Sequence, residues 1–253
     1  MNIADMHVYF RQYAQQMGMQ NVRAIIPDQI DILINTAIVD IVNKIVRDNV
    51  GVRNDKLIKD YSKIGDVDAL KTLCTHAFSQ IKAVTEYRTC QECLTYSNDD
   101  NIADMMYAIS STIAYLKYNQ NTQPVAELTV LARIMSNTDI QQSINDDVLK
   151  PKINSPIIYI NSPTDNALYL PKKTLEYINN STGNIILWNN YMVIVRVDYL
   201  KYPTKVSITT DTNCDLPESL HVDIVKYAAE LYKNIVSKGS YYQPQQATTA
   251  TNK

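Results

Sequence analysis

Glycine is scarce in this sequence, and the positions of the few glycines exclude two large classes of nucleotide-binding protein. Only five occur in 253 residues, and no two of them lie close enough to build a phosphate-binding loop. The backbone of such a loop must approach a phosphate closely, which requires clustered glycines. Dinucleotide-binding folds of the Rossmann type and P-loop folds are therefore excluded.

Long apolar runs and an excess of basic residues are missing as well. No apolar run reaches the roughly 20 residues that a membrane-spanning helix needs. The opening residues also lack the basic and apolar stretches of a signal peptide. The 24 basic and 26 acidic residues give a formal net charge of −2, which argues against a dedicated nucleic-acid-binding protein. We therefore expect no membrane partner, and thiols that stay reduced.

Phenylalanine and tryptophan are rare, whereas tyrosine is abundant. The chain has 18 Tyr, 2 Phe and 1 Trp. Tyrosine combines an apolar ring with a polar hydroxyl, which suits surfaces that become buried and still need a hydrogen bond. Two interpretations stay open: extensive protein–protein interfaces, or a genomic codon bias that also favours Asn, Ile and Lys.

Two amphipathic helices are predicted before residue 50. Apolar side chains recur at three- and four-residue intervals from Ile3 to Met17, and Gly18 is placed to end this first helix. The second helix starts at Pro27, runs to about Arg47 and has the widest apolar face in the chain. We expect this face to pack on its own domain or on a neighbouring subunit. Its candidate interface residues are Ile34, Ala37, Ile38 and Ile41. A third, shorter helix is predicted over 66–78.

From about residue 80 the composition changes to Val, Ile, Thr and Tyr with Pro- and Asn-rich breaks, which is typical of β-strands. The candidate strands are 81–95, 107–118, 126–133, 157–160, 185–188 and 192–199. The stretch 107–118 also fits a helix. Residues 139–151 are polar and are predicted to form a connection with at most a helical turn. We expect this region to be a mainly antiparallel β domain.

A last amphipathic helix is predicted to begin at Asp215, with Glu218 completing a capping arrangement, and to end at Gly239. Its apolar residues recur at helical spacing and should bury the helix. The candidate interface residues on it are Leu220, Ile224, Ala228 and Leu231.

The final segment, 240–253, is rich in Gln, Thr and Ala and has no periodicity. Such a segment is predicted to be disordered in the free chain and to order only on binding. Tyr241 and Tyr242 are its candidate docking residues.

These elements predict an α+β fold. An N-terminal helix pair or bundle and a C-terminal amphipathic helix combine with a mainly antiparallel β middle region. The expected divisions are a helical region 1–79, a β-rich region 80–212, a helix 213–239 that packs on the helical region, and a tail 240–253.

Motifs for catalysis or metal binding are weak. Cys90 and Cys93 form a C-x-x-C, but no second pair accompanies it and residues three apart on a strand face opposite sides. Asp211, Asp215 and Glu218 gather near a helix start, where capping explains the last two and three oxygens fall short of a calcium site. We expect no catalytic residue, no cofactor and no metal, so the chain is predicted not to be an enzyme.

Two end segments resemble the head-to-tail connector proteins (adaptor or neck ring proteins) of tailed bacteriophages, closest to crAss-like and related podovirus-type phages. The first segment contains His7 and Phe10, followed by Pro27–Asp31 and Leu33–Ala37. The second contains Tyr199–Val206, then Cys214–His221 and the pair Ile224-Val225. Unlike many adaptors, this chain has a substantial β region between its helical ends.

The resemblance implies a structural virion protein located in the phage neck or tail and assembled in the host cytoplasm. It implies a homo-oligomeric ring, commonly a dodecamer, that joins the portal protein to neighbouring neck or tail rings. Double-stranded DNA would pass through the ring channel with only transient contact.

Two alternatives remain at this stage. A small hydrolase or nuclease of an unfamiliar family would use the acids near residue 211 and the C-x-x-C. A non-virion module that binds a host protein would share the composition but would be absent from purified particles.

Overall fold

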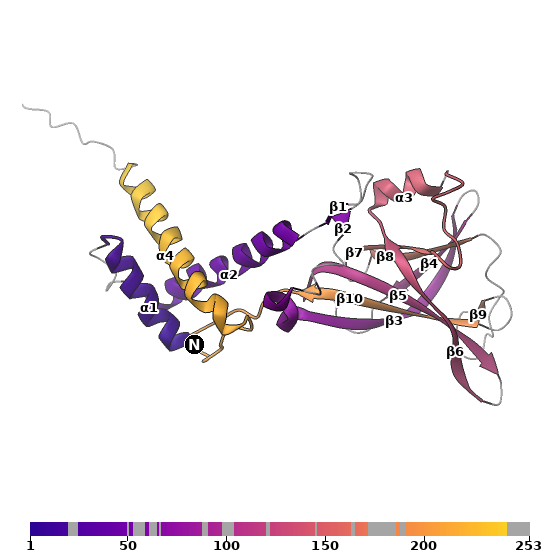
Figure 1. Cartoon of the computed structure of the whole chain (residues 1–253), viewed down its shortest axis with the longest axis horizontal. Helices are drawn as coiled ribbons and strands as arrows, with labels where there is room; N and C mark the ends of the chain where they lie inside the picture. The colour runs from indigo at the N-terminus through magenta and orange to yellow at the C-terminus, as the bar shows by residue number, and fades with distance from the viewer. Residues whose placement is uncertain are drawn as a thin grey trace, which may run out of the picture. The chain divides into compact units, whose positions relative to one another are not determined.

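The computed structural model describes residues 1–19, 25–49, 51–52, 59–60, 65, 67–87, 91–97, 104–119, 122–144, 146–162, 165–171, 186–187 and 191–241. The chain forms two compact units. Unit 1 comprises Met1–Ile45 and Pro203–Lys253, and unit 2 comprises Val46–Tyr202 (Figure 1). Unit 2 is thus an insertion in the sequence of unit 1. Helices combine with a mostly antiparallel sheet, which confirms the predicted α+β fold.

Unit 1 is helical, and its helices lie where the apolar periodicity predicted them. They are α1 (Ile3–Gln16), α2 (Pro27–Asn49, which runs on into unit 2) and α4 (Glu218–Tyr241). Asn2 accepts a hydrogen bond from the backbone of Asp5, whose carboxylate accepts one in return, so a capping box starts α1. Gly18 follows the last turn with φ of 85°. A residue without Cβ adopts this left-handed conformation at little cost, so α1 ends there as predicted.

The core of unit 1 comes from the apolar stripes of the three helices. Phe10 of α1 packs against Tyr232 of α4, with ring centroids 6.0 Å apart. Complete burial of an aliphatic or aromatic side chain stabilises a fold by about 1.5–3 kcal/mol, so this core is the main source of stability in unit 1. Its buried members include Ile3, Met6, Phe10, Ile30, Ile34, Ala37, Ile38, Ile224, Val225, Ala228 and Ala229.

Unit 2 is built around one closed sheet. Its strands are β3 (Cys74–Tyr87), β4 (Gln91–Ser97), β5 (Met105–Asn119), β6 (Thr122–Ile134), β7 (Ile157–Ser162), β8 (Asp165–Pro171), β9 (Ile186–Leu187) and β10 (Tyr191–Lys201). The order β3-β4-β8-β7-β6-β5-β10 closes because β10 also pairs with β3, while β9 adds to one end of β10. Only the β6–β7 pairing, among those described, is parallel.

Alternating residues of the strands fill the inside of this closed sheet. On β10 the inward positions are Val193, Val195, Val197 and Tyr199, all buried. They meet apolar residues of five other strands, because successive side chains on a strand point to opposite faces. Those partners are Ala77, Ile113, Tyr115, Val130, Ala132, Ile158 and Leu168.

A short helix, α3 (Asn137–Ile144), packs against the outside of the sheet (Figure 1). Ile140 of α3 forms a second buried cluster with Met135, with Ile157 of β7 and with Tyr169 of β8. The polar segment 139–151, predicted as a connection with at most a helical turn, therefore begins inside a true helix.

The helix predicted over 66–78 is wrong. The structure has a short 3₁₀ helix, η3 (Asp68–Leu73), and β3 begins directly at Cys74. Residues 74–79 pair with β10 in register, for example Ala77 with Val197. Pairing with a distant strand therefore outweighs a local apolar spacing that also suited a helix.

Three other boundaries differ from the predictions. The strand predicted over 81–95 is two strands, β3 and β4, and the expected boundary at residue 79 falls inside β3. Gly239 does not end the last helix, because α4 continues to Tyr241; glycine within a helix costs only about 1 kcal/mol. The predicted strands 107–118, 126–133, 157–160 and 192–199 are confirmed with slightly longer bounds. Of the predicted strand 185–188 the structure describes residues 186–187, which form β9.

Two minor strands complete unit 2. They are β1 (Gly51–Val52) and β2 (Lys59–Asp60), which pair antiparallel with each other. Nowhere in the described ranges does a helix combine enough length and apolar character to cross a bilayer.

Candidate functional site

The segment between β10 and α4 belongs to unit 1 and contacts α1 and α2, and we call residues 203–217 the strap. The strap is held in shape by its own side chains: the carboxylate of Asp215 accepts hydrogen bonds from the backbone N–H and the hydroxyl of Thr204, at 3.1 and 2.5 Å. Ser207 and Thr212 form a two-way backbone bridge around a tight turn. In this turn Asp211 has φ of 50°. The strap is therefore a defined local structure rather than an open connection.

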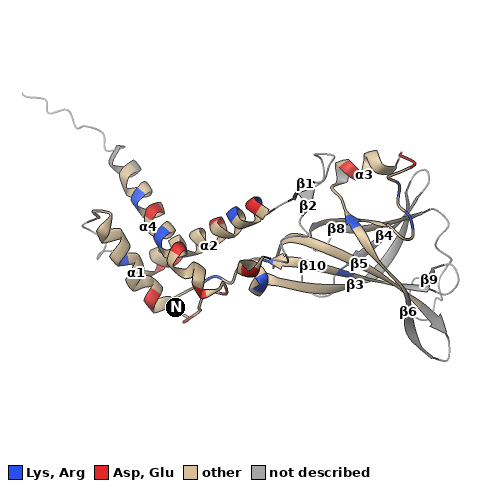
Figure 2. Cartoon of the chain, viewed as in Figure 1, with Lys and Arg blue, Asp and Glu red and all other residues tan. Residues whose placement is uncertain are grey.

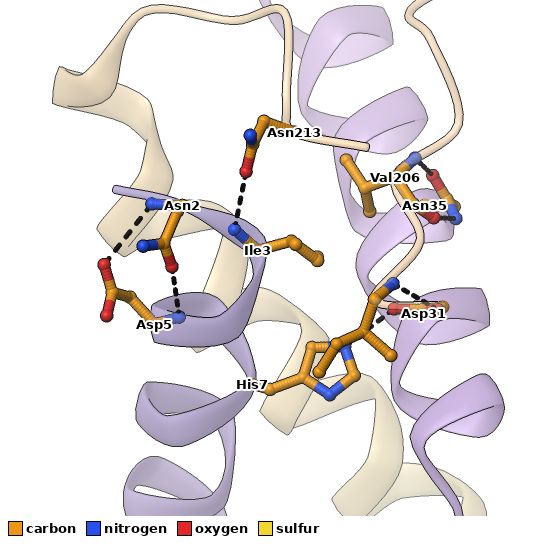
Figure 3. Close-up of polar contacts among 9 residues, drawn as sticks. Asn2, Ile3, Asp5, His7, Asp31, Asn35, Val206 and Asn213 are labelled. Atoms are coloured by element: carbon orange, nitrogen blue, oxygen red, sulfur yellow. Dashed lines mark hydrogen bonds and ion pairs between the residues drawn. The ribbon is translucent and has the colours of Figure 1, made fainter. Parts of the chain in front are cut away.

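Asp31 of α2 links the strap to α1 (Figure 3). Its Oδ1 lies 2.7 Å from Nε2 of His7, and its Oδ2 accepts the backbone N–H of Ile208 at 3.1 Å. His7 and Asp31 are 4% and 7% exposed. A carboxylate with so little solvent is tolerated only when it is paired and hydrogen-bonded. One buried side chain thus joins two helices and the strap.

Asn35, one helical turn after Asp31, makes a second connection (Figure 3). Its side-chain amide donates to the carbonyl of Val206 at 2.9 Å and accepts the N–H of Val206 at 2.8 Å. The amide thereby pairs with the strap as a neighbouring strand would. Neither aspartate nor leucine could make both contacts, so this position requires an amide.

The strap also contacts the beginning of α1. The side-chain oxygen of Asn213 accepts the backbone N–H of Ile3 at 2.8 Å, which satisfies one of the free donors in the first turn of that helix. The amine of Met1 pairs with Glu218 at 2.5 Å and holds the pKa of this carboxyl below its usual value. The starts of α1 and α4 are therefore tied together.

His221 of α4 completes this set of polar contacts, which we call the polar junction. Its members are His7, Asp31, Asn35, Val206, Asn213, Asp215 and His221. Nε2 of His221 lies 2.8 Å from the carbonyl oxygen of Leu216, and the side chain is buried. This contact requires a proton on Nε2. It fixes the entry of the strap into α4, which begins at Glu218 rather than at the predicted Asp215.

The acids near residue 211 do not converge on a common point. Asp211 lies in the strap turn, Asp215 binds Thr204, and Glu218 binds the amine of Met1. Across the residues that the structure describes, no group of three or more His, Cys, Asp or Glu side chains could hold a metal ion. The polar junction is consistent with a structural role, because its described side chains are used to hold helices and strap together.

The predicted interface residues fall into three groups. Five are buried within the chain, three are half-buried, and Tyr241 lies in the last turn of α4 while Tyr242 is outside the described residues. The buried ones pack inside the molecule and offer no surface to a neighbour. The buried residues are Ile34, Ala37, Ile38, Ile224 and Ala228, and the half-buried ones are Ile41, Leu220 and Leu231.

Exposed apolar side chains in unit 1 are different residues from the predicted interface set; one of them, Ile235, continues the apolar spacing of the last helix but is 60% exposed. On α1, the exposed Tyr9 stacks on Tyr13 at 6.4 Å between centroids, and the ammonium of Lys226 lies 5.7 Å from the Tyr13 ring. The Tyr13 ring is thus already contacted by a cation of the same chain, while Tyr9 presents an exposed aromatic ring beside it. The exposed large apolar residues of unit 1 include Val8, Tyr9, Ile26, Ile32, Ile235 and Val236.

The described thiols Cys74 and Cys214 lack the features of reactive cysteines. Burial raises the pKa of both, and the charge of Asp198 contributes to the shift at Cys74. A raised pKa keeps a thiol protonated and a poor nucleophile. Cys93 lies in β4 opposite Thr85, whereas Cys90 lies outside the described residues, so the C-x-x-C prediction stays untested.

Charges in the described part of the chain are mixed in sign. Figure 2 shows Lys and Arg interspersed with Asp and Glu along the helices of unit 1. Such a surface lacks the stripe of positive charge that grips a phosphate backbone. The densest local groups of basic residues in the sequence are Arg47, Arg53, Lys56 and Lys59, and the pair Lys172-Lys173. Of these, Arg53, Lys56, Lys172 and Lys173 lie outside the described residues.

No family model matches the chain, and no curated protein matches it either.

Proposed function

We propose that this chain is a structural subunit of a homo-oligomeric ring in the neck of a tailed bacteriophage. The ring would join the portal protein to a neighbouring neck or tail ring and surround the DNA channel. In this role the protein works through its geometry and its contacts with other subunits, and it performs no reaction.

The observation that carries the proposal is the composition of the polar junction in unit 1. The two end segments that resemble connector proteins supply its members: Asp31 and Asn35 come from the first, and Val206, Asp215 and His221 from the second. The resemblance therefore rests on residues that specify one particular packing of helices and strap. Proteins of a structural family are expected to share the residues that hold their fold together rather than a set of catalytic residues.

The exposed apolar residues of both units support oligomerisation. Exposed apolar side chains mark interaction sites where they form a contiguous patch; unit 1 exposes Val8 and Ile32, and unit 2 exposes Val148, Phe78 and Leu131. Side-to-side contacts between identical subunits would cover such residues, and a rotation that closes would produce a ring.

The mixed surface charge supports a channel wall that DNA slides past. A protein that neutralises many phosphates binds DNA tightly, which would hold back a moving genome. The formal net charge of −2 and the interspersed charges fit transient contact better.

Two measurements test the proposal. Mass spectrometry of purified phage particles should detect the chain as a virion component. Negative-stain imaging of the purified protein, alone and with the portal protein, should show rings or rings stacked on the portal. A chain that is absent from particles would instead support the non-virion module.

The C-terminal tail has its own experiment. Removing residues 242–253 leaves every described contact of unit 1 in place, so folding should be unchanged. If the tail docks on the adjacent ring through Tyr242, attachment of the rings should weaken while each ring still forms. Unchanged attachment would show that the tail has no docking role.

A further inference from the structure

Unit 2 exposes a row of residues on the outside of its closed sheet. Arg196 of β10 lies opposite Phe78 of β3 and opposite Thr112 of β5, and Thr112 lies opposite Leu131 of β6. Directly paired residues share one face of a sheet, so these four form a line across four strands. Three strand spacings of about 4.8 Å make this line roughly 14 Å long. We call it the outer row.

The outer row combines apolar side chains with a fixed cation. Phe78 and Leu131 are 49% and 64% exposed. Between them, the guanidinium of Arg196 is held by Asp198, with Nε and Nη2 at 2.9 and 2.8 Å from the same oxygen. Ser110 donates to the other oxygen of Asp198 at 2.9 Å. Arg196 is therefore pre-oriented, and its other N–H groups can bind a further carboxylate.

A second exposed feature of unit 2 is the loop after α3, residues 146–153, which we call the aliphatic loop. Val148 is 76% exposed, and Leu149 and Ile153 are exposed as well. Ahead of them Asp147 extends into solvent, with its side chain 97% exposed. The loop thus presents a carboxylate next to aliphatic side chains.

The aliphatic loop is rigid, because hydrogen bonds hold it from both ends. Oδ1 of Asp146 accepts the backbone N–H groups of Val148 and Leu149 at 2.7 and 3.3 Å. From β6, Arg133 donates to the carbonyl of Leu149 at 2.7 Å and to that of Lys150 at 3.3 Å. A loop that is ordered before binding loses little entropy when it docks.

We infer that the aliphatic loop of one copy docks on the outer row of a second copy, with Asp147 paired to Arg196 and with Val148 and Leu149 packed against the apolar side chains of the row. Carboxylate meets guanidinium, and aliphatic side chains meet an apolar surface. Every copy carries both halves, so the contact can repeat from copy to copy. The inference rests on the proposed ring function and names one contact through which its subunits associate.

Asp147 can exchange its present partner, Lys150, for Arg196 of a second copy at a small cost in free energy. In the free chain Asp147 pairs with Lys150 at 2.8 Å, three residues away and in solvent. Lys150 lowers the pKa of the Asp147 carboxyl, which therefore stays charged. Exposed pairs of this kind contribute little to stability, whereas a charge pair enclosed in an interface can couple strongly.

Charge reversal tests the contact. Self-association of the wild-type chain is measured by mass photometry and analytical ultracentrifugation. Asp147→Lys and Arg196→Glu should each weaken it at least about tenfold, since close charge pairs across interfaces couple by more than the roughly 1.4 kcal/mol that equals a factor of ten. An equimolar mixture of the two variants should recover association, because in alternating copies positions 147 and 196 of every contact again carry opposite charges.

Two further variants keep the test independent of folding. Asp68→Lys is the matched control: Asp68 pairs with Lys71 at the same three-residue spacing and is similarly exposed, but it belongs to neither the loop nor the row. It should leave association unchanged. Val148→Asp changes an exposed side chain without touching Arg196, and it should abolish the contact while the thermal unfolding curve stays that of the wild type.

The outcomes separate this inference from the proposed function. Rings that form equally well with Asp147→Lys and Val148→Asp overturn the contact and leave the ring in place. A wild-type chain that remains monomeric, or that uses the loop only on another kind of protein, also overturns the contact. In that case the particle experiment decides the proposed function by itself.

Discussion

The two units of this protein are stabilised in different ways. Unit 1 combines a helical apolar core with a few buried polar side chains, such as Asp31 and Asn35, that each make two contacts to the backbone or a neighbouring helix. Unit 2 relies on the register of a closed sheet whose inward side chains, such as Ile113, form an apolar interior. In unit 1 single polar residues therefore determine how the helices and the strap pack. In unit 2 the arrangement of the strands depends on many strand pairings together.

The largest effect is expected in unit 1 for Asp31→Ala. The change leaves the buried His7 ring and the half-buried N–H of Ile208 without an acceptor. Each lost partner costs about 1–3 kcal/mol, so the two together cost about 2–6 kcal/mol. Urea unfolding followed by far-ultraviolet circular dichroism, which reports mainly on the long helices, should show this loss. Asp48→Ala on the exposed side of the same helix is the control and should be near neutral. Equal stability of the two variants would contradict the role given to Asp31.

In unit 2, Ile113→Ala should cost about 2–5 kcal/mol, because it leaves a cavity inside the sheet. Ile113 is fully buried. Differential scanning calorimetry can measure the loss of stability. Leu131→Ala, on the outer face of the neighbouring strand, should change stability by less than about 0.5 kcal/mol. A similar loss of unfolding free energy in both variants would contradict the assignment of Ile113 to the buried inner face and of Leu131 to the exposed outer face.

Asn35→Ala should have an intermediate effect of about 1–3 kcal/mol, since the N–H and the carbonyl of Val206 both lose their partner. Thr36→Ala, the neighbouring exposed residue whose hydroxyl binds only within its own helix, is the matched control. Limited proteolysis offers a second measurement: cleavage in the strap should accelerate in Asn35→Ala alone. A strap that stays protected would show that Asn35 does not hold it.

The smallest effect at neutral pH is expected for Tyr115→Phe, about 1 kcal/mol, because it removes one hydrogen bond to the carbonyl of Ile153. Burial raises the pKa of Tyr115 from 10.0 to about 12. The neutral phenol therefore stabilises the fold fully below a pH of about 10, and this contribution is lost as the pH rises towards 12. The difference in unfolding free energy between wild type and Tyr115→Phe should shrink over that range. A constant difference would contradict the raised pKa.

The sequence predicted unit 1 better than unit 2 for a physical reason. A helix is a local structure, so the apolar spacing from Ile3 to Met17, Gly18 and Pro27 contain nearly all the information that places α1 and α2. The start of β3 depends on pairing with β10, more than a hundred residues later, and the local pattern over 66–78 favoured a helix instead.

The sequence also predicts local features of the candidate site better than contacts between distant residues. Burial of Ile34 and Ile224 agrees with their apolar patterns, which cannot distinguish a helix core from a subunit interface. The contact between Asp31 and Ile208 joins positions 177 residues apart, and no periodicity could predict it. The outer row depends on strand register, which the sequence does not contain as a local signal. The sequence Asp215-Leu216-Pro217-Glu218 predicts a helix cap at Asp215, yet the carboxylate of this residue binds Thr204.

The insertion of unit 2 into unit 1 has a consequence for biosynthesis. During translation the ribosome releases Met1–Ile45 long before Pro203 and α4, whose residues cover the apolar faces of α1 and α2. The inserted sheet can form first. Until α4 has been synthesised, the apolar faces of α1 and α2 remain uncovered. In the nascent chain these helices should therefore bind chaperones, and their protection should begin only when the last fifth of the protein has emerged.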